Sequence, residues 1–338
     1  MKRVERSLLS VLLLTCVMQG RAAAQGPSQG PSLAPSSPSS TEGALFLLLP
    51  VGAQGVAVGR AMTAMQGPES VWWNPAGLAA VNHSRFVMIR GDQVAGTETA
   101  ASLLFAKPGV GVLGVSYLLL DEGSQDLTDA DGNVVGTISV RNHLAVLSAA
   151  TRILGHLDAG VNLKMVQFRL SCRGLCPEGG TVATTYAVDA GIQLEPTHAF
   201  PLRVGAMVAH MGPRFQVVNA AQADPLPTRA RVAVAYDVLR SLTQRRDLQA
   251  WITTEVQERV RNPGPMAFYV GSELKAGVED ALYLRAGYVV NDVDAESGAR
   301  VGLGLHYERF DLSIAKSLAV STLTGQTEPV QVTFSVMF

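Results

Sequence analysis

Hydrophobic and polar residues alternate along most of the chain after residue 84, in short segments separated by turn residues. The clearest segment runs from Val301 to Glu308. Valine, leucine and tyrosine occupy one face of the extended chain there, and glycine, histidine and glutamate occupy the other. The pattern returns around residues 231–238, 281–288 and 330–338. A period of two predicts β-strands with one face in an apolar environment and the other in a polar one.

Fourteen such segments are expected along the chain, an even number that allows an antiparallel sheet to close with both ends on the same side. The expected strands are residues 85–90, 98–106, 110–120, 135–152, 157–170, 181–194, 201–210, 227–239, 247–258, 266–276, 281–290, 299–308, 310–316 and 329–338.

Connections of two lengths separate the expected strands. Long ones follow odd-numbered strands (121–134, 171–180, 211–226 and 317–328), and mostly tight ones such as 107–109 follow even-numbered strands. This alternation is typical of the extracellular loops and periplasmic turns of bacterial barrels, and a soluble sandwich has no reason to show it. We therefore predict an all-β fold: a closed antiparallel transmembrane β-barrel of about 14 strands, over residues 84–338, in the outer membrane of a diderm bacterium.

Charged residues gather on the strand face opposite the apolar one. They are Asp158, Lys164, Asp189, Arg203, Arg231, Asp237, Glu255, Glu273, Lys275, Arg285, Arg300, Glu308 and Asp311. Their near-balance of sign predicts paired charges inside the barrel rather than an open pore that selects ions of one sign. Filling and solvating the interior is the simpler interpretation for any single residue.

The first residues have the pattern of an export signal. Lys2, Arg3 and Arg6 precede an apolar run that is too short to span a bilayer, and Ala22–Ala24 offers a cleavage site. We expect a signal peptide at residues 1–24 and a flexible Pro/Ser/Gly linker at residues 25–43. A lipoprotein anchored through Cys16 is the alternative. No later apolar stretch reaches 18 residues, which excludes a helical inner-membrane protein.

Between linker and barrel lies a glycine-punctuated stretch, residues 44–83, that is not strand-like throughout. Residues 60–66 are expected to form a helical turn or two, and the residues around Pro75 a sharp turn with Asn74 extended. The glycines do not form a phosphate loop, because no GK[ST] follows them.

Residues 46–79 resemble the N-terminal signature of PorV/PorQ-type outer-membrane proteins, which are relatives of the FadL-like transporters of hydrophobic compounds. The signature passes from an apolar segment through a Gly-rich stretch to an aromatic-Asn-Pro-Ala-Gly-Leu motif. The matching residues here are Trp72, Trp73, Asn74, Pro75, Ala76 and Gly77. Many relatives carry an acidic pair before the motif, where this chain has Gln66–Ser70. The short loops argue against a large extracellular capture platform.

The resemblance implies a fourteen-stranded barrel with a small hatch, residues 44–83, in the lumen. We expect the hatch at the periplasmic end, because residues 44–80 are apolar and precede a strand that must start on the periplasmic side. It implies binding or passage of hydrophobic small molecules. A PorV-like role with secreted proteins in a type IX secretion system is the alternative, and an outer-membrane enzyme is a third. The expected partners are outer-membrane lipid and the barrel assembly machinery, with hydrophobic small molecules or secreted proteins as cargo.

Little in the sequence points to catalysis. None of the six histidines stands in a recognised catalytic or metal-binding spacing, and no GxSxG occurs. We therefore expect no enzyme activity, no cofactor and no metal. A net charge of −1 argues against a nucleic-acid partner. Cys172 and Cys176 are expected to form a local disulfide, and Phe338 resembles the terminal aromatic signal for barrel assembly.

Overall fold

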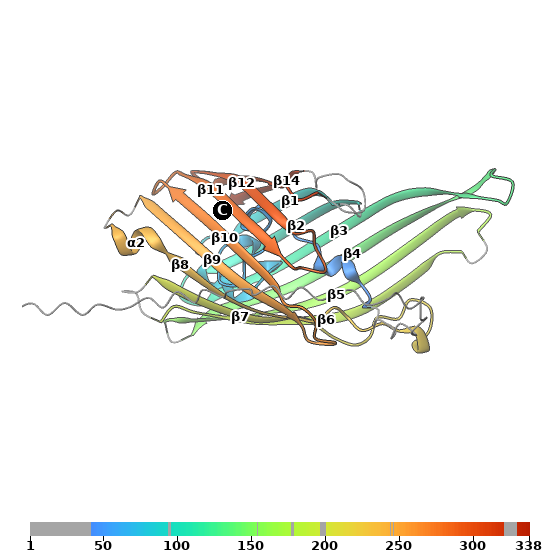
Figure 1. Cartoon of the computed structure of the whole chain (residues 1–338), viewed down its shortest axis with the longest axis horizontal. Coiled ribbons are helices and arrows are strands. Elements are labelled where there is room, and N and C mark those ends of the chain that lie inside the picture. Colours follow the sequence, from blue (N-terminus) through green and yellow to red (C-terminus); the bar gives the residue numbers. More distant parts are fainter. Residues whose placement is uncertain are drawn as a thin grey trace, which may run out of the picture. The chain divides into compact units, whose positions relative to one another are not determined.

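The computed structural model describes residues 42–93, 96–153, 155–176, 179–196, 201–243, 245, 247–320 and 330–338. The expected signal peptide and the linker up to residue 41 lie outside these residues. Within the described part, fourteen strands form a closed barrel (Figure 1). The strands are β1 (Arg85–Gln93), β2 (Gly96–Lys107), β3 (Gly111–Thr128), β4 (Val134–Ile153), β5 (Leu157–Gly174), β6 (Thr181–Leu194), β7 (Leu202–Met211), β8 (Arg229–Asp237), β9 (Leu248–Arg259), β10 (Ala267–Ala276), β11 (Ala281–Val290), β12 (Gly298–Tyr307), β13 (Phe310–Ser317) and β14 (Val330–Met337).

Each strand pairs antiparallel with its neighbours in sequence, and β1 pairs with β14 to close the sheet. Closure leaves no open edge, so every strand has its backbone groups paired on both sides. The predicted fold class and strand order are therefore confirmed. We call the end that carries the connections after odd-numbered strands the loop end, and the opposite end, where β1 starts and β14 finishes, the turn end.

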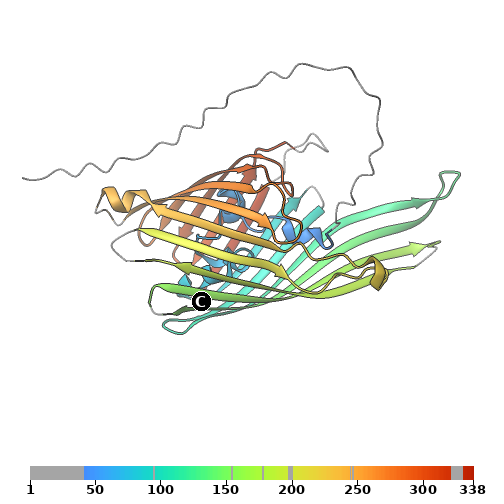
Figure 2. The ribbon, with the colours of Figure 1, turned by 60° about the horizontal axis from the view of Figure 1, so that its bottom comes forward.

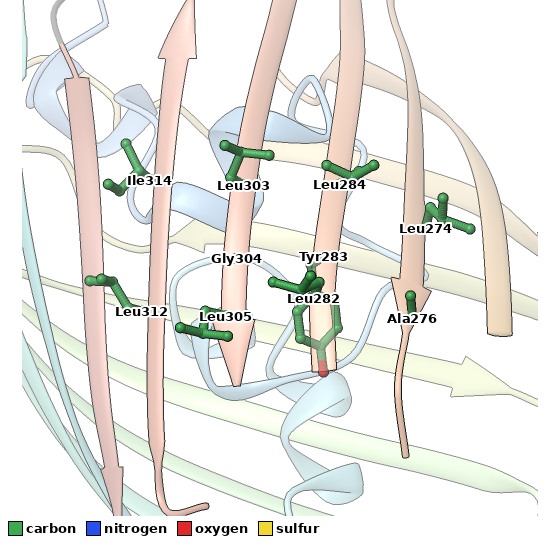
Figure 3. A pocket seen from close by; sticks show the side chains of 10 residues that line it. All are labelled: Leu274, Ala276, Leu282, Tyr283, Leu284, Leu303, Gly304, Leu305, Leu312 and Ile314. Atoms are coloured by element: carbon green, nitrogen blue, oxygen red, sulfur yellow. The ribbon is translucent and has the colours of Figure 1, made fainter. Parts of the chain in front are cut away.

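The alternation along each strand separates an apolar outer face from an inner face, as predicted. In β12, Leu303 and Leu305 are exposed while Arg300 and Gly304 are buried. Leucines and isoleucine of β10–β13 lie side by side on the outer wall, where they line a shallow groove of about 390 Å³ (Figure 3). Outward apolar side chains in a closed barrel form the surface that faces lipid.

Several strand ends predicted from the sequence are wrong. β3 continues to Thr128 and β5 to Gly174, so much of two expected loops is paired strand. Figure 1 shows the β3–β4 hairpin reaching beyond its neighbours. Both faces of this extension meet water, so no alternation marks it. The expected strand 227–239 ends early, because Asp237 accepts a hydrogen bond from the Arg240 N–H (3.2 Å) and starts helix α2 (Val238–Leu242).

None of the helices among the described residues has the length and apolar character needed to cross a membrane.

The lipid-facing assignment predicts a position-dependent cost for charge. Leu303, with 62% of its surface exposed, lies in the apolar belt, so Leu303→Arg should lower the free energy of unfolding by about 2–4 kcal/mol. Leu175→Arg is the matched control, because Leu175 is 75% exposed beyond the end of β5. Urea-dependent folding into phospholipid vesicles measures both. Equal tolerance of the two changes would contradict the assignment of faces.

Candidate functional site

Residues 42–83, which we call the lumen segment, run through the interior of the barrel. The segment contains η1 (Leu45–Leu48), α1 (Ala53–Ala57), η2 (Pro68–Val71) and η3 (Pro75–Ala80). In both ribbon views its blue ribbons lie within the ring of strands (Figure 1, Figure 2).

The lumen segment starts at the loop end and finishes at the turn end. The Arg229 side chain, at the start of β8, pairs with Glu42 (2.6 Å), and the Gly43 N–H donates to the Pro225 carbonyl (2.9 Å). The segment then leads into β1, whose first residue is at the turn end. We expected residues 44–83 at the periplasmic end; their first part instead lies at the opposite end of the lumen.

The local structure of the lumen segment also differs from the expectation. The helical turn is at Ala53–Ala57 rather than at residues 60–66. Arg60 adopts a left-handed conformation (φ 69°), which ends any helix there. Its guanidinium pairs with Asp292 (3.1 Å), which also accepts a hydrogen bond from Tyr269 (2.8 Å).

Backbone groups of the lumen segment are hydrogen-bonded to inward side chains of the barrel at two main places. At Pro50–Ala53, Gln331 and Thr333 of β14 and Gln93 of β1 are the partners. At Thr63–Met65, the partners are Gln193 of β6, Arg203 of β7 and Glu255 of β9. These bonds satisfy backbone groups that would otherwise be buried without partners.

A set of inward glycines allows the backbone of the lumen segment to approach the wall closely. A Cβ at Gly287 of β11 would collide with the backbone of Val58 and Gly59, and similar collisions would occur on β5–β7, β10 and β12. The glycines whose side-chain position the lumen segment occupies are Gly160, Gly191, Gly205, Gly271, Gly287 and Gly302. Sequence reasoning missed them, although glycine inside a strand is a known sign that another backbone comes near.

The aromatic-Asn-Pro motif folds into a compact corner in the lumen. Asn74 is fully buried; its side chain accepts from the Ala76 N–H (3.1 Å) and donates to the Thr63 carbonyl (2.7 Å). Pro75 and Ala76 begin η3, and Gly77 lies against Ser70 and the Met65 carbonyl. The motif therefore ties two distant parts of the lumen segment together.

The two tryptophans of the motif have different surroundings. Trp73 donates its indole N–H to the Val51 carbonyl (2.9 Å), and the Arg231 guanidinium lies 5.5 Å from its ring centre. Trp72 packs between two apolar clusters, and its buried indole N–H has no partner among the described residues.

Glu69 is a buried carboxylic acid that sequence reasoning missed. It accepts hydrogen bonds from the Thr333 hydroxyl (2.7 Å) and the Gly55 N–H (3.0 Å). Burial raises the pKa of the Glu69 carboxyl above its ordinary value near 4.5, against the opposing effects of these two bonds and of the nearby Arg285. The folded lumen therefore holds the Glu69 proton more tightly than water does.

Most of the inward charges predicted from the sequence occur in pairs. Lys164 lies 2.6 Å from Asp189, and Arg285 lies 2.6 Å from Glu273. Other interior pairs are Arg152–Asp158, Arg203–Glu195, Arg231–Glu255 and Arg229–Asp294. Asp237, Lys275 and Glu308 have no ion pair among the described residues. Asp237 instead accepts from the backbone at the start of α2, and Glu308 lies in the turn after β12 and is exposed.

Lys164 and Asp189 belong to a buried cluster whose polar atoms bond to one another. Asp189 accepts from Asn162 (3.0 Å) and from the His210 N–H (2.8 Å), and the Lys164 amine is 3.3 Å from the His210 ring nitrogen. Asn162 also donates to the Val71 carbonyl (2.9 Å). The cluster therefore fixes the lumen segment to β5 and does not face the large lumen cavity described below.

One side of the lumen is apolar, which the sequence pattern did not reveal. We call this surface, on β1–β5, the apolar wall; its buried residues are Val87, Ile89, Ala100, Leu104, Val112, Leu118, Leu120, Leu144, Val146 and Val166. Leu47, Val51, Val71 and Leu78 of the lumen segment belong to the same cluster. On the apolar wall itself, Ser102 lies opposite Ser116, and neither hydroxyl has a partner among the described residues.

A polar cavity of about 1020 Å³ occupies the turn end of the lumen. Its lining combines Glu273, Lys275, Arg285 and Asp311 of the barrel with Glu69 and other residues of the lumen segment. The mixed charges suit water rather than an apolar ligand.

Cys172 and Cys176 form a disulfide at the end of β5. At the other end of the barrel, the Phe338 N–H donates to the Ser84 carbonyl (2.9 Å), and the Phe338 side chain is exposed. The role of Phe338 in assembly stays a prediction.

No protein-family model and no curated protein matches the chain. Solved structures of similar fold do exist. They include the toluene transporter TbuX of Ralstonia pickettii (12% identity, 85% of this chain and 98% of that chain, TM-score 0.56) and the CymD monoaromatic hydrocarbon channel (12%, 85%, 97%, 0.57). The toluene transporter TodX of P. putida is a third (12%, 85%, 99%, 0.52). The chain therefore has the fold of these channels.

This fold, a closed barrel with an apolar outer belt, places the protein in the outer membrane of a Gram-negative bacterium. In such barrels the longer loops are extracellular and the short turns periplasmic. The loop end thus faces outward, and the polar cavity opens on the periplasmic side.

The close approach at Gly287 predicts that a side chain there dislodges the lumen segment. Gly287→Val should cost about 1–3 kcal/mol and make Arg60 accessible to trypsin in the folded barrel, because the Val58–Gly59 backbone must move. Gly264→Val is the control, since a Cβ at Gly264 meets nothing within 4 Å. If trypsin cleaves Gly287→Val no faster than wild type, the lumen segment accommodates the valine by a local shift, and the predicted displacement is wrong.

The raised pKa of Glu69 predicts that the lumen segment is held more weakly as the pH rises. The folded state keeps the Glu69 proton at pH values where the unfolded chain has lost it, so this stabilisation is complete below about 4.5 and declines through the raised pKa. The protection of the Gly55 amide from hydrogen exchange, measured relative to the intrinsic exchange rate at each pH, should fall over that range in the native protein and stay constant in Glu69→Gln. An equal pH response in both would assign the effect to another group.

Proposed function

We propose that this barrel binds hydrophobic small molecules and passes them across the outer membrane, with the lumen segment as its gate. The apolar wall is the observation that carries the proposal. An aqueous pore has no need of ten buried apolar residues along one side of its lumen, whereas an apolar ligand needs such a surface to leave water. The fold likeness to TbuX, CymD and TodX, which are a toluene transporter, a monoaromatic hydrocarbon channel and a second toluene transporter, supports the same ligand class.

The lumen segment occupies the place of such a ligand. Leu47 and Val51 pack in the cluster of the apolar wall, and Phe46 and Leu49 pack beside it. Displacing Phe46, Leu47 and Leu49 would expose part of the wall to a molecule of similar hydrophobicity. The exchange of one apolar contact for another keeps the energetic cost of opening low.

Two parts of the lumen segment differ in how firmly they are held. Residues 50–53 and 63–65 hydrogen-bond to barrel side chains, whereas the backbone N–H groups of Leu47 and Leu49 donate to the carbonyls of Ala44 and Phe46 within the segment. Apolar contacts and the Glu42–Arg229 pair therefore hold residues 44–49. We assign the moving part of the gate to residues 44–49 and the fixed part to residues 50–83.

The partnerless polar atoms give the proposed path some selectivity. Ser102 and Ser116 point their hydroxyls to one place on the apolar wall, and the Trp72 indole N–H lies in the same cluster. A few polar groups in an apolar site orient a ligand. An apolar molecule with one hydrogen-bonding group fits this arrangement.

The finer PorV/PorQ assignment, which rests on the motif from Trp72 to Gly77, would add secreted proteins as partners. We place passage of small molecules ahead of it, because the buried wall is too enclosed to contact a protein. Channels as fold neighbours likewise favour transport over catalysis.

Deletion of residues 45–49 tests the gate. Vesicles that contain the deletion variant should take up an apolar fluorophore about tenfold faster than vesicles with wild type. This factor is expected if the gate of the wild type is open about a tenth of the time and the deletion leaves it always open. A charged solute of similar size should gain much less, because residues 50–83 still fill the lumen. Folding is checked by heat-dependent gel migration.

A second substitution in the deletion background tests the path itself. Leu118→Asn places a polar group on the apolar wall and should slow uptake, whereas outward-facing Leu119→Asn leaves the wall unchanged and should not. If both behave alike, or if the deletion raises uptake of charged and apolar solutes equally, hydrophobic passage along the apolar wall is wrong.

A further inference from the structure

Successive cross-strand rows on the outer face of β3–β6 change from apolar to charged toward the loop end. From the belt outward the rows are Val115–Leu147–Leu163, Tyr117–Ala145–Met165–Tyr186, Leu119–His143–Gln167–Thr184 and Asp121–Arg141–Arg169–Val182. The two exposed tyrosines match the aromatic girdle at a membrane interface. The charged row therefore stands just beyond the hydrocarbon layer, on the extracellular side.

Two arginines face each other in the charged row. Arg141 of β4 and Arg169 of β5 are direct cross-strand partners, and both side chains are exposed on the outer face. Like charges directly opposite in an antiparallel pair destabilise it. Such a pair is therefore a cost unless something between the side chains offsets it.

Two carboxylates would be needed to neutralise Arg141 and Arg169, and the described part of the chain places only one beside them. Asp121 lies 2.9 Å from the Arg141 guanidinium, while Arg169 has no hydrogen-bond or ionic partner among the described residues. Arg169, Ser171 and Arg173 lie at every second position of β5 and so share its outward face, and Arg173 is also exposed. In the row below, the Tyr117 hydroxyl and the His143 ring nitrogen are 2.6 Å apart and add polar groups beside the arginines.

We propose that Arg141 and Arg169 bind the phosphate of a phosphorylated glycolipid in the outer leaflet. The guanidinium fork matches phosphate oxygens in pairs, and one phosphate can accept from two facing arginines. The acyl chains of the same lipid would lie on the apolar belt below, along Val115, Leu147 and Leu163. The site combines an anion receptor with an acyl-chain surface below it on the same strands.

Binding to a phosphorylated diglucosamine lipid tests this site. Full-length protein in neutral detergent is mixed with the lipid or with its dephosphorylated form, and the complexes are counted by native mass spectrometry. Wild type should prefer the phosphorylated lipid about tenfold, and Arg141→Gln/Arg169→Gln should lose the preference. Lys107→Gln/Arg309→Gln is the matched control, because it removes two exposed cations from the turn end. It should keep the preference.

Stability without lipid provides the second readout. Arg169→Gln should be at least as stable as wild type in lipid-free detergent, because the repulsion is gone, and less stable than wild type once the phosphorylated lipid is added. Loss of stability in lipid-free detergent would instead give Arg169 a structural role and overturn the proposal. So would a preserved lipid preference in the double variant. Complete competition by millimolar inorganic phosphate would make the site a receptor for free anions and not for lipid.

Discussion

A chain segment that crosses the inside of a barrel must find partners for its own backbone. The N–H and C=O groups of the strands are hydrogen-bonded to neighbouring strands, so they are not available to a segment in the lumen. Inward side chains must supply the missing partners, and here Gln193, Gln331, Thr333 and Glu255 do so. The positions of these four residues decide where the lumen segment can be fixed, and the rest of the interior follows from that.

The same requirement divides the lumen into two kinds of surface. Most polar side chains that bind backbone of the lumen segment are on β5–β7, β9 and β14, with Gln93 on β1 in addition, and the apolar wall is on β1–β5. An apolar surface can hold the lumen segment only through side chains such as Leu47, and such contacts are non-directional. Firm anchoring and easy displacement therefore belong to different sides of the barrel, which is what a gate needs.

The barrel itself could be predicted from sequence because lipid imposes a simple rule on it. Every outward residue in the belt must be apolar, so residues such as Leu303 and Leu284 mark their strand with period two. The extension of β3 around Ser124 meets water on both faces, and no rule of this kind marks it as strand. The sequence therefore predicted β12 and β14 closely and ended β3 eight residues too early.

The interior was harder to predict because the residue type at an inward position depends on its contact with the lumen segment, whereas outward positions all face the same lipid. Val87 and Leu118 look like breaks in a polar face until Leu47 and Val51 are seen to complete their cluster. Gly287 looks like a weak strand residue until Gly59 is found against it. Each of these residues is specified by a contact with a partner more than 35 positions away, and no local pattern records such a contact.

The direction in which the lumen segment runs links the gate to the outside of the cell. Glu42 meets Arg229 and, through it, Asp294 at the loop end, so the least firmly bonded part of the segment, residues 44–49, lies nearest the extracellular side. A hydrophobic molecule that arrives from outside would therefore meet the displaceable part first. The fixed part and the polar cavity lie beyond it, toward the periplasm. Because displacement begins at the outer end, the barrel can admit a ligand while residues 50–83 still close the lumen to water and ions.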